Sequence, residues 1–279
     1  MIVGNSREAH DVHGIEAAIG DLRDFFTNDN HWVYHSKGTP SLITPDSIYH
    51  ITQLQVLVEN KHFHPLTYRA IQELRQTRFL DSREVPSRIG RSILVWRSGI
   101  RYVERQIKAH TKLVEEYSSE LINKATGDYA ETLVLLGLSR LHLNLVSRET
   151  RQYRDRMWTQ SDHNLDFIME KGPVAYGIEV KNTFGYMPAD EFAIKLQMCE
   201  FLGIRPLFVV RNRDKIQWQK AKDAGGLIFM FKTKVFPPGQ DALVQRIWKE
   251  MRLPVGILHD WHPSFYNTIL SFLQLGNNS

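Results

Sequence analysis

The stretch LDFIMEKGPVAYGIEVKN, residues 165–182, decides the fold of this chain. Its two apolar runs are separated by Gly172 and Pro173, which predicts two antiparallel β-strands joined by a tight turn. Asp166, Glu179 and Lys181 lie within these strands, where valine, isoleucine or leucine would be easier to bury. The reason for these three charges therefore bears on both the fold and the function.

The predicted register of this hairpin brings two acids together. Side chains alternate between the faces of a strand, so Glu179 and Lys181 share one face. If Glu170 pairs with Ala175, Asp166 stands directly opposite Glu179. Like charges opposite each other destabilise a strand pair, and a divalent cation between them would offset that cost. A slip of one residue would place the two carboxylates on opposite faces.

The pattern around the hairpin predicts a central sheet with helices on its faces, which is an α/β (α+β) fold. The expected order is helix, strand, strand, strand, helix, strand, followed by a further helix and strand. The expected ranges are a helix at 127–141, a strand at 142–149, the hairpin strands at 165–170 and 175–181, a helix at 188–203, a strand at 205–212, a helix at 214–225 and a strand at 226–232.

Glu131 adds a third carboxylate in the first of these helices. The residues around it on the helix are so apolar that we expect the helix to be buried, and a buried acid needs a partner. Taken singly, each acid is better explained as a surface charge or a structural salt bridge, and Lys181 as a strand-end lysine that pairs with Glu179. Their occurrence together favours a site. The apolar neighbours are Leu133, Val134, Leu135, Leu136 and Leu138.

Asp166, followed after twelve residues by Glu179-Val180-Lys181, resembles the PD-(D/E)xK motif of the restriction-endonuclease-like nuclease superfamily. The upstream GDYAE, which contains Glu131, is similar to the arrangement in Holliday-junction resolvases and many restriction endonucleases. Gln197 resembles a glutamine of RecB-like members. The resemblance covers about residues 120–235 and includes the αβββαβ order of the common core. Leu165 stands where the name of the motif has proline.

The resemblance implies a metal-dependent phosphodiesterase. Its hard oxygen ligands, completed by waters, suit Mg²⁺, with Mn²⁺ as a substitute. The metal would polarise the phosphate and lower the pKa of its bound water. The implied roles are metal binding by Asp166, Glu179 and the Val180 carbonyl, orientation or deprotonation of the attacking water by Lys181, support of the metal or of a second ion by Glu131, and positioning of Lys181 or the phosphate by Gln197.

Upstream of this region, residues 41–108 resemble a winged helix-turn-helix module. Thr44 and Pro45 predict the start of one helix, Pro65 predicts the start of a second over 65–78, and SRIGRSILVWRSGIRY predicts a β-ribbon. A basic stripe on these elements suits phosphate contacts. The alternative is a helical accessory domain with a solvated charged face. The expected DNA-binding residues are Arg69, Arg75, Arg88, Arg91, Arg97 and Arg101.

The bulk composition limits the remaining possibilities. The chain has 279 residues, a formal net charge of +4 and one cysteine, Cys199. A single cysteine excludes an intrachain disulfide framework and a cysteine-based zinc site. No signal peptide or membrane-spanning stretch is read from the sequence, so we expect a cytoplasmic, intracellular protein without a membrane partner.

The sequence therefore predicts a two-part, Mg²⁺-dependent DNA endonuclease of restriction, repair or mobile-DNA processing. The expected parts are a segment of unknown role (1–40), a winged-helix-like DNA-binding module (41–108) and a nuclease domain (109–279). The expected partner is duplex or branched DNA, with a homodimer or two visits needed for a double-strand cut. The alternatives are a non-catalytic DNA-binding regulator on a nuclease-like scaffold and an RNA-cleaving enzyme.

Overall fold

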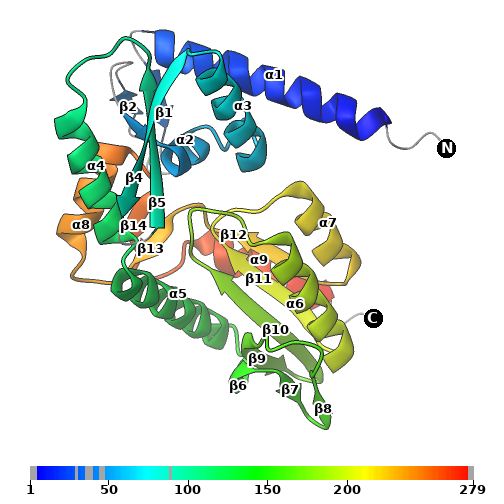
Figure 1. Cartoon of the computed structure of the whole chain (residues 1–279). Coiled ribbons are helices and arrows are strands. Elements are labelled where there is room, and N and C mark those ends of the chain that lie inside the picture. Colours follow the sequence, from blue (N-terminus) through cyan, green and yellow to red (C-terminus); the bar gives the residue numbers. More distant parts are fainter. Residues whose placement is uncertain (1–4, 29–30, 35–39, 44–47, 88–89, 276–279) are drawn as a thin grey trace. The chain divides into compact units, whose positions relative to one another are not determined.

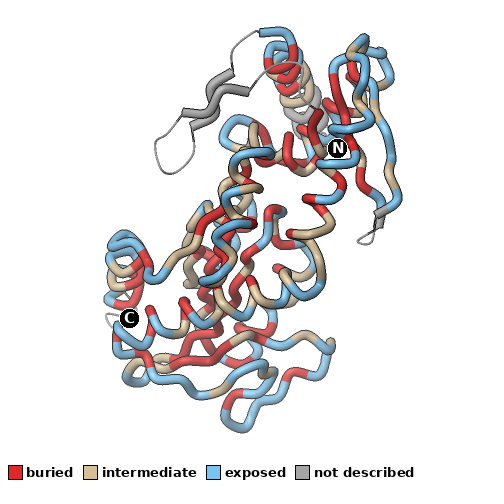
Figure 2. Tube along the Cα trace, turned by 90° about the vertical axis from the view of Figure 1, so that its left-hand side faces the viewer, coloured by how far each residue is buried: buried red, intermediate tan, exposed pale blue. Residues whose placement is uncertain are grey.

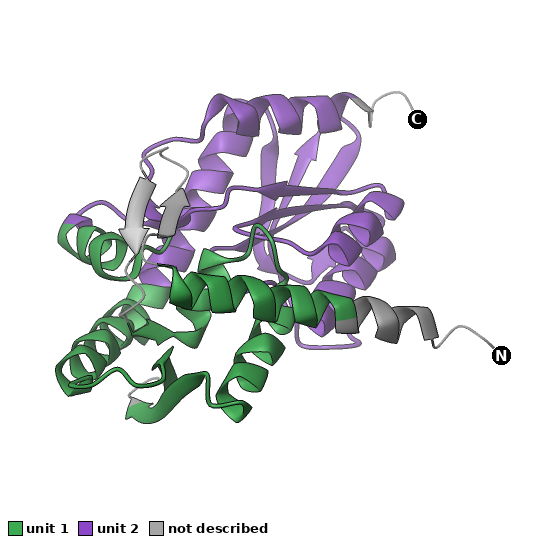
Figure 3. Cartoon of the chain, turned by 90° about the horizontal axis from the view of Figure 1, so that it is seen from above, with its two compact units in different colours: residues 1–123, 242–254 green, residues 124–241, 255–279 purple. Residues whose placement is uncertain are grey.

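The structure, a computed structural model, describes residues 5–28, 31–34, 40–43, 48–87 and 90–275 of a mixed α/β protein. The chain forms two compact units (Figure 3). Unit 1 contains residues 1–123 and 242–254, and unit 2 contains residues 124–241 and 255–279. The sequence placed the boundary between residues 108 and 109. The structure instead places residue 109 inside a helix of unit 1.

Unit 1 consists of helices and short antiparallel sheets. Its described elements are α1 (Asn5–Thr27), β1 (His31–Tyr34), β2 (Pro40–Ile43), β3 (Tyr49–His50), α2 (Ile51–Leu57), α3 (His64–Gln76), β4 (Leu80–Ser87), β5 (Gly90–Arg97), α4 (Glu104–Tyr117), most of α8 (Asp241–Arg246) and the π-helical turn η1 (Ile247–Met251).

A three-stranded sheet in the order β3-β5-β4 packs against the helices of unit 1. Leu22 of α1, Leu54 of α2 and Ile71 of α3 are fully buried in one core with Val95 of β5. Burial of such side chains is the main source of stability for a small unit. Helix α1, which lies in the segment of unknown role, is thus part of this core.

The helix expected to begin at Thr44 and Pro45 begins later in the chain. Thr44 and Pro45 lie outside the described residues, and α2 begins at Ile51. His50 caps the helix: its ring accepts the N–H of Thr52, and the Gln53 side chain accepts the N–H of His50. This reciprocal pair of hydrogen bonds determines where α2 begins, because it satisfies main-chain N–H groups that have no partner within the first turn of a helix.

Unit 2 is built around a five-stranded mixed sheet. Its elements are most of α5 (Glu120–Arg140), β6 (Asn144–Thr150), β7 (Gln152–Tyr153), β8 (Arg156–Met157), β9 (Leu165–Lys171), β10 (Val174–Lys181), α6 (Ala189–Leu202), β11 (Arg205–Val210), α7 (Lys215–Asp223), β12 (Leu227–Met230), β13 (Lys234–Phe236), β14 (Val255–Ile257) and α9 (Pro263–Leu275).

The strand order of this sheet is β12-β11-β10-β9-β6. Strands β6, β9 and β10 are antiparallel neighbours, whereas β10, β11 and β12 run parallel. The helix, strand, strand, strand, helix, strand order expected from the sequence is found among the elements of this sheet and its helices, followed by helix α7 and strand β12, but the short pair β7–β8 is inserted between β6 and β9. Figure 1 shows α6 and α7 on one face of this sheet.

The side chains of the sheet divide between two apolar layers. Phe167, Tyr176 and Leu207 pack with α5 and α9 on one face. Ala175 and Phe208 pack with α6 and α7 on the other. Because both faces are covered, β9, β10 and β11 are buried along most of their length, as the red stretches of Figure 2 show, whereas the edge strand β6 is largely exposed. A charged side chain in the middle of such a sheet therefore requires a specific partner.

The tail of the chain is divided between the units. The nuclease domain expected over residues 109–279 includes this tail, and α9 does pack on the sheet of unit 2. Residues 242–254 instead belong to unit 1, where the Gln53 side chain donates to the carbonyl of Met251 over 2.8 Å. In the described part of the chain, no helix is long and apolar enough to cross a membrane.

Candidate active site

The two acids of the opening stretch lie close enough to interact electrostatically. Strands β9 and β10 pair Glu170 with Ala175 and continue to Phe167 with Ile178. The pairs of this register end there, and continuing it by one residue would place Asp166 opposite Glu179. The N–H of Val180 donates to Asp166 Oδ2 over 2.7 Å, which fixes the Asp166 carboxylate against β10.

Burial makes this carboxylate pair energetically expensive. Glu179 is only 1% exposed. Burial, followed by the nearby charge of Asp166, raises the pKa of Glu179 to about 7. Burial also raises the pKa of Asp166 to about 6, despite the hydrogen bond from Val180, which favours ionisation. Strongly perturbed acids that share a site are characteristic of functional centres, although structural ion pairs also produce them.

Lys195 of α6 is the main partner of Glu179, and the sequence analysis missed it. Its side chain is 4% exposed, with Nζ 2.5 Å from Glu179 Oε2. The same Nζ donates to the main-chain carbonyl of Asn164, the second residue before Asp166. Lys195 thus connects the strand that carries Glu179 to the segment that leads into Asp166.

A signal for Lys195 was present in the sequence. It lies three residues after Phe192 and three or four residues before Met198 and Cys199, all buried residues of α6. A lysine at that spacing lies on the apolar face of the helix, where a buried anion is needed to balance its charge.

Lys181 lies at the end of β10, on the same face as Glu179. Its Nζ is 3.4 Å from Glu179 Oε1 and 2.7 Å from Glu191 Oε1 of α6. Burial acts to lower the pKa of Lys181, but Glu179 and Glu191 outweigh it and raise the pKa. The Lys181 side chain is 29% exposed, so a charged ammonium group next to the carboxylate pair can be reached from solvent.

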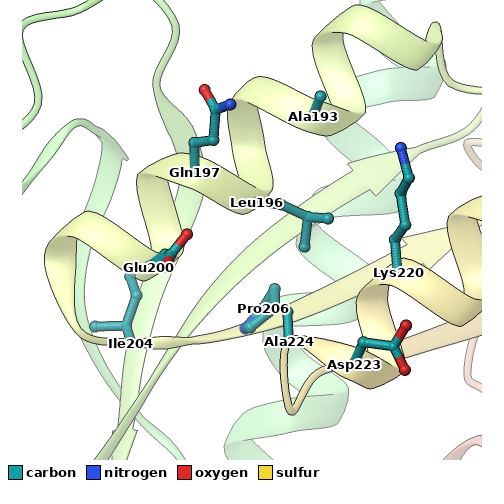
Figure 4. A pocket seen from close by; sticks show the side chains of 9 residues that line it. All are labelled: Ala193, Leu196, Gln197, Glu200, Ile204, Pro206, Lys220, Asp223 and Ala224. Atoms are coloured by element: carbon teal, nitrogen blue, oxygen red, sulfur yellow. The ribbon is translucent and has the colours of Figure 1, made fainter.

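Gln197 does not join this group. It is exposed on α6 and lines a surface pocket of about 560 Å³ between α6 and α7 (Figure 4). Two residues along a helix correspond to roughly 200°, so Gln197 and the buried Lys195 lie on nearly opposite sides of α6. The expected position of Gln197 beside Lys181 is therefore not observed, and Lys195 and Glu191 are the α6 side chains that contact the site.

Glu131 lies close enough to the pair to interact electrostatically with both acids. Burial raises its pKa, with smaller contributions from Asp128 and Glu179, and Glu131 in turn raises the pKa of Asp166. The expectation that its helix is buried all round is wrong, because Leu136 is 53% exposed. Glu131 is thus a partly buried neighbour of the pair.

The end of β10 is anchored by a second set of polar residues that the sequence analysis did not single out. The buried Asn182 side chain donates to the carbonyls of Thr126 and Val235, over 2.9 and 2.7 Å, and accepts the N–H of Val235. The fully buried Arg211 donates to the carbonyl of Phe184 over 2.6 Å. These bonds fix the main chain directly after Lys181.

The carboxylate pair fits a hard divalent cation in charge and donor type. Among the described residues, no three His, Cys, Asp or Glu side chains gather in a group that could hold a metal ion. A metal here would take the carboxylates of Asp166 and Glu179 together with main-chain oxygen and water. Mg²⁺ accepts that donor set, because it commonly binds one or two carboxylates and keeps several waters.

The expected DNA-binding arginines lie in unit 1, apart from Arg88, which is outside the described residues. Arg69, Arg97 and Arg101 are exposed. The other two interact with neighbours in the same unit. Arg75 donates to Ser82 over 2.9 Å, and Arg91 lies 3.1 Å from Glu84 of β4. Strand β4, which the sequence analysis did not predict, therefore adds an acid to the basic ribbon.

The raised pKa of Asp166 makes stability depend on pH. A carboxyl with a pKa near 6 in the folded state and 3.8 when unfolded stabilises the fold below about pH 4, and that stability is lost as pH rises through 6. Metal-free Asp166→Asn is expected to be about 2 kcal/mol more stable than the wild type at pH 8, with little difference near pH 4. Urea unfolding with EDTA measures this, with the exposed Asp162→Asn as a control; equal differences at both pH values would contradict it.

No protein-family model matches the chain, and neither a curated protein nor a solved structure matches it.

Proposed function

We propose that this protein is a metal-dependent nuclease that hydrolyses phosphodiester bonds in DNA. The observation that carries the proposal is the pair of neighbouring carboxylates, the buried Glu179 and the half-buried Asp166, with Lys181 two residues beyond Glu179 on the same strand face. The order of the elements around them, α5-β6-β9-β10-α6-β11, supports a restriction-endonuclease-like core of the PD-(D/E)xK type.

Asp166, Glu179 and the Val180 carbonyl would hold Mg²⁺ or Mn²⁺, which when bound polarises the phosphate and activates water. Lys181 supplies a positive charge for the developing phosphorane and a donor that orients the attacking water. Glu191 holds the Lys181 ammonium group in place. Lys195 fixes the Glu179 carboxylate and neutralises part of its charge in the buried site.

Unit 1 supports a role in gripping DNA. Its elements run α1-β3-α2-α3-β4-β5, and the strand order β3-β5-β4 is that of a winged helix-turn-helix module. In that interpretation α3 is the recognition helix and the β4–β5 ribbon is the wing. Thr67 of α3 is fully buried and contributes nothing to this surface.

Charge reversal in the ribbon tests this role. Arg91→Glu combined with Arg97→Glu is expected to weaken duplex binding at least about 10-fold. It should also reduce the salt slope of binding by about 2, because fewer counterions are released from the DNA when two phosphate contacts are lost. Fluorescence anisotropy over a range of KCl concentrations measures both quantities. Lys249→Glu, an exposed charge of unit 1 outside the ribbon and α3, serves as the control. An effect no larger than that of Lys249→Glu would reduce the ribbon to a solvated surface.

One observation favours the alternative of a non-catalytic DNA-binding regulator. The Lys195–Glu179 ion pair neutralises a buried carboxylate without any metal, which suits a scaffold that has lost catalysis. Against this interpretation, the chain keeps Asp166 and Lys181 beside Glu179, and a scaffold needs neither. Metal binding separates the two proposals, because the regulator needs no cation at this position.

Nicking of supercoiled plasmid tests the function itself. The wild-type protein is expected to convert supercoiled plasmid to open circles in Mg²⁺ or Mn²⁺ and to leave it intact in EDTA. A structured RNA in the same assay tests the RNA-cleaving alternative. A folded protein that cleaves neither substrate in any divalent metal would contradict the proposal. Linear product before open circles would indicate paired active sites, as in a homodimer.

A further inference from the structure

A second basic surface lies at the sheet edge that carries Lys181. The parallel strands β10, β11 and β12 end side by side, with Lys181 paired to Val210 and Val210 to Met230. The N–H of Arg211 donates to the carbonyl of Lys181 over 3.0 Å, so the segment after β11 starts directly beside the end of β10. The carboxyl ends of parallel strands are where open α/β sheets bind their ligands.

The segment after β11 presents cations around an exposed aromatic ring. Trp218 of α7 is 38% exposed. The guanidinium of Arg213 lies over the ring at 4.9 Å from its centroid, and Lys222 Nζ lies at 5.6 Å. An aromatic ring holds a cation in place by its electrostatic attraction, whereas a carboxylate would also neutralise the charge of the cation. The ring thus positions both Arg213 and Lys222.

Helix α7 is fixed so that one of its sides carries these residues. Asp214 caps the helix by accepting the N–H of Gln217 over 2.7 Å, and the Gln217 side chain donates to the carbonyl of Met187. With Gln217 buried, Lys215, Trp218 and Lys222 follow the spacing i, i+3, i+7 along one exposed side of the helix.

The charge of this segment suits a polyanion. Between Arg213 and Asp223 four cationic side chains outnumber two acids. Both acids serve the helix itself, since Asp214 caps it and Asp223 accepts from Gln219 over 2.7 Å. The fourth cation, Lys220, lies on the other side of α7, where it lines the pocket next to α6 (Figure 4).

We infer that Arg213, Lys215 and Lys222, organised around Trp218, contact the phosphates of the DNA strand as it enters the carboxylate site. The inference rests on the proposed function and adds to it a substrate-binding surface within unit 2 itself. The segment that carries it leaves the sheet next to the end of β10, and the surface extends along the exposed side of α7. This surface would bind DNA without sequence specificity, because its cations interact with the charge of the phosphate backbone and not with the base edges.

Equilibrium binding in EDTA tests the surface without cleavage. The probe is a fluorescein-labelled DNA duplex titrated with the full-length protein over a range of KCl concentrations. Arg213→Gln combined with Lys222→Gln is expected to weaken binding about 10-fold and to reduce the salt slope by roughly 1 to 2. Lys220→Gln, on the same helix but facing α6, is expected to change neither. Equal effects of the double variant and Lys220→Gln would overturn the inference.

Trp218 provides a second, independent readout. Trp218→Leu is expected to weaken binding about 3-fold by releasing both cations, whereas Trp218→Phe retains a ring and most of the affinity. Equal affinities for Trp218→Leu and the wild type would count against the organising role of the ring.

Plasmid nicking by the wild type in Mg²⁺, measured in parallel, separates this inference from the proposed function. Wild-type nicking together with unchanged binding by the Arg213 and Lys222 variant overturns the inference alone. Weakened binding by that variant without any wild-type nicking overturns the proposed function alone.

Discussion

Plasmid nicking is expected to slow by at least about 10³-fold in Asp166→Ala and by about 10² to 10⁴-fold in Lys181→Ala. The two losses have different physical origins. Asp166→Ala removes one of the two facing carboxylates and with it a ligand of the metal. Lys181→Ala leaves both carboxylates in place and removes a partly exposed cation that contacts Glu179. The losses should therefore differ in their metal dependence.

A titration of Mn²⁺ in the nicking assay separates the two origins. Lys181→Ala should reach half its maximal rate within about 3-fold of the wild-type Mn²⁺ concentration, whereas added Mn²⁺ should restore part of the rate of Asp166→Ala. Asp162→Ala, an exposed acid just before β9, controls for loss of charge near the site. Nicking by Asp166→Ala and Lys181→Ala at the wild-type rate would place the active site elsewhere.

Lys195→Met is expected to cost about 3 to 5 kcal/mol of unfolding free energy in EDTA near pH 8. The substitution keeps the length and apolar stem of the side chain but leaves the carboxylate of Glu179 buried without its closest cation. It also removes a donor to the Asn164 carbonyl. Urea unfolding measures the loss.

A double substitution separates the charge from the packing. Glu179→Gln added to Lys195→Met should recover most of the lost stability, because a neutral amide is far cheaper to bury than an unpaired carboxylate. Lys220→Met provides the control for an exposed lysine in the same unit. A cost below about 1 kcal/mol for Lys195→Met would show that the ion pair contributes little, as at an exposed site.

The hairpin was the most predictable part of the molecule. Gly172, at φ +59°, and Pro173 form the two-residue connection between β9 and β10, and the register that follows brings Asp166 and Glu179 together. Alternation along a strand and the geometry of a tight turn are local properties, so a single sequence contains them. The order of helices and strands in unit 2 was predictable for the same reason.

The contacts made by α6 were not predictable in the same way. Gln197 was expected at the site because of its resemblance to a glutamine of RecB-like nucleases. The rotation of α6 about its axis instead places Lys195 and Glu191 at the site. That rotation depends on packing against β10 and β11, including the close approach of Cys199 to Gly177, where an added Cβ would lie 2.7 Å from its sulfur. Tertiary packing of this kind leaves only a weak trace in the sequence.

In unit 1 the missed features depend on long-range pairing. Strand β4 contains Asp81, Glu84 and Pro86, which are depleted in strands, and it is defined by its pairing with β5. The return of residues 242–254 to unit 1 depends on contacts such as that between Gln53 and the Met251 carbonyl, nearly two hundred residues apart. No local pattern specifies either feature.

The central claim is that Asp166 and Glu179 face each other in order to hold a divalent cation, and direct Mn²⁺ binding tests it most directly. Isothermal titration of the DNA-free protein at pH 8 is expected to show Mn²⁺ binding that weakens at least about 10-fold in Asp166→Asn and in Glu179→Gln. The exposed Asp162→Asn is expected to bind like the wild type. Equal Mn²⁺ affinity in all four proteins, or no binding by the wild type, would contradict the claim and leave the pair as a structural ion-pair cluster around Lys195.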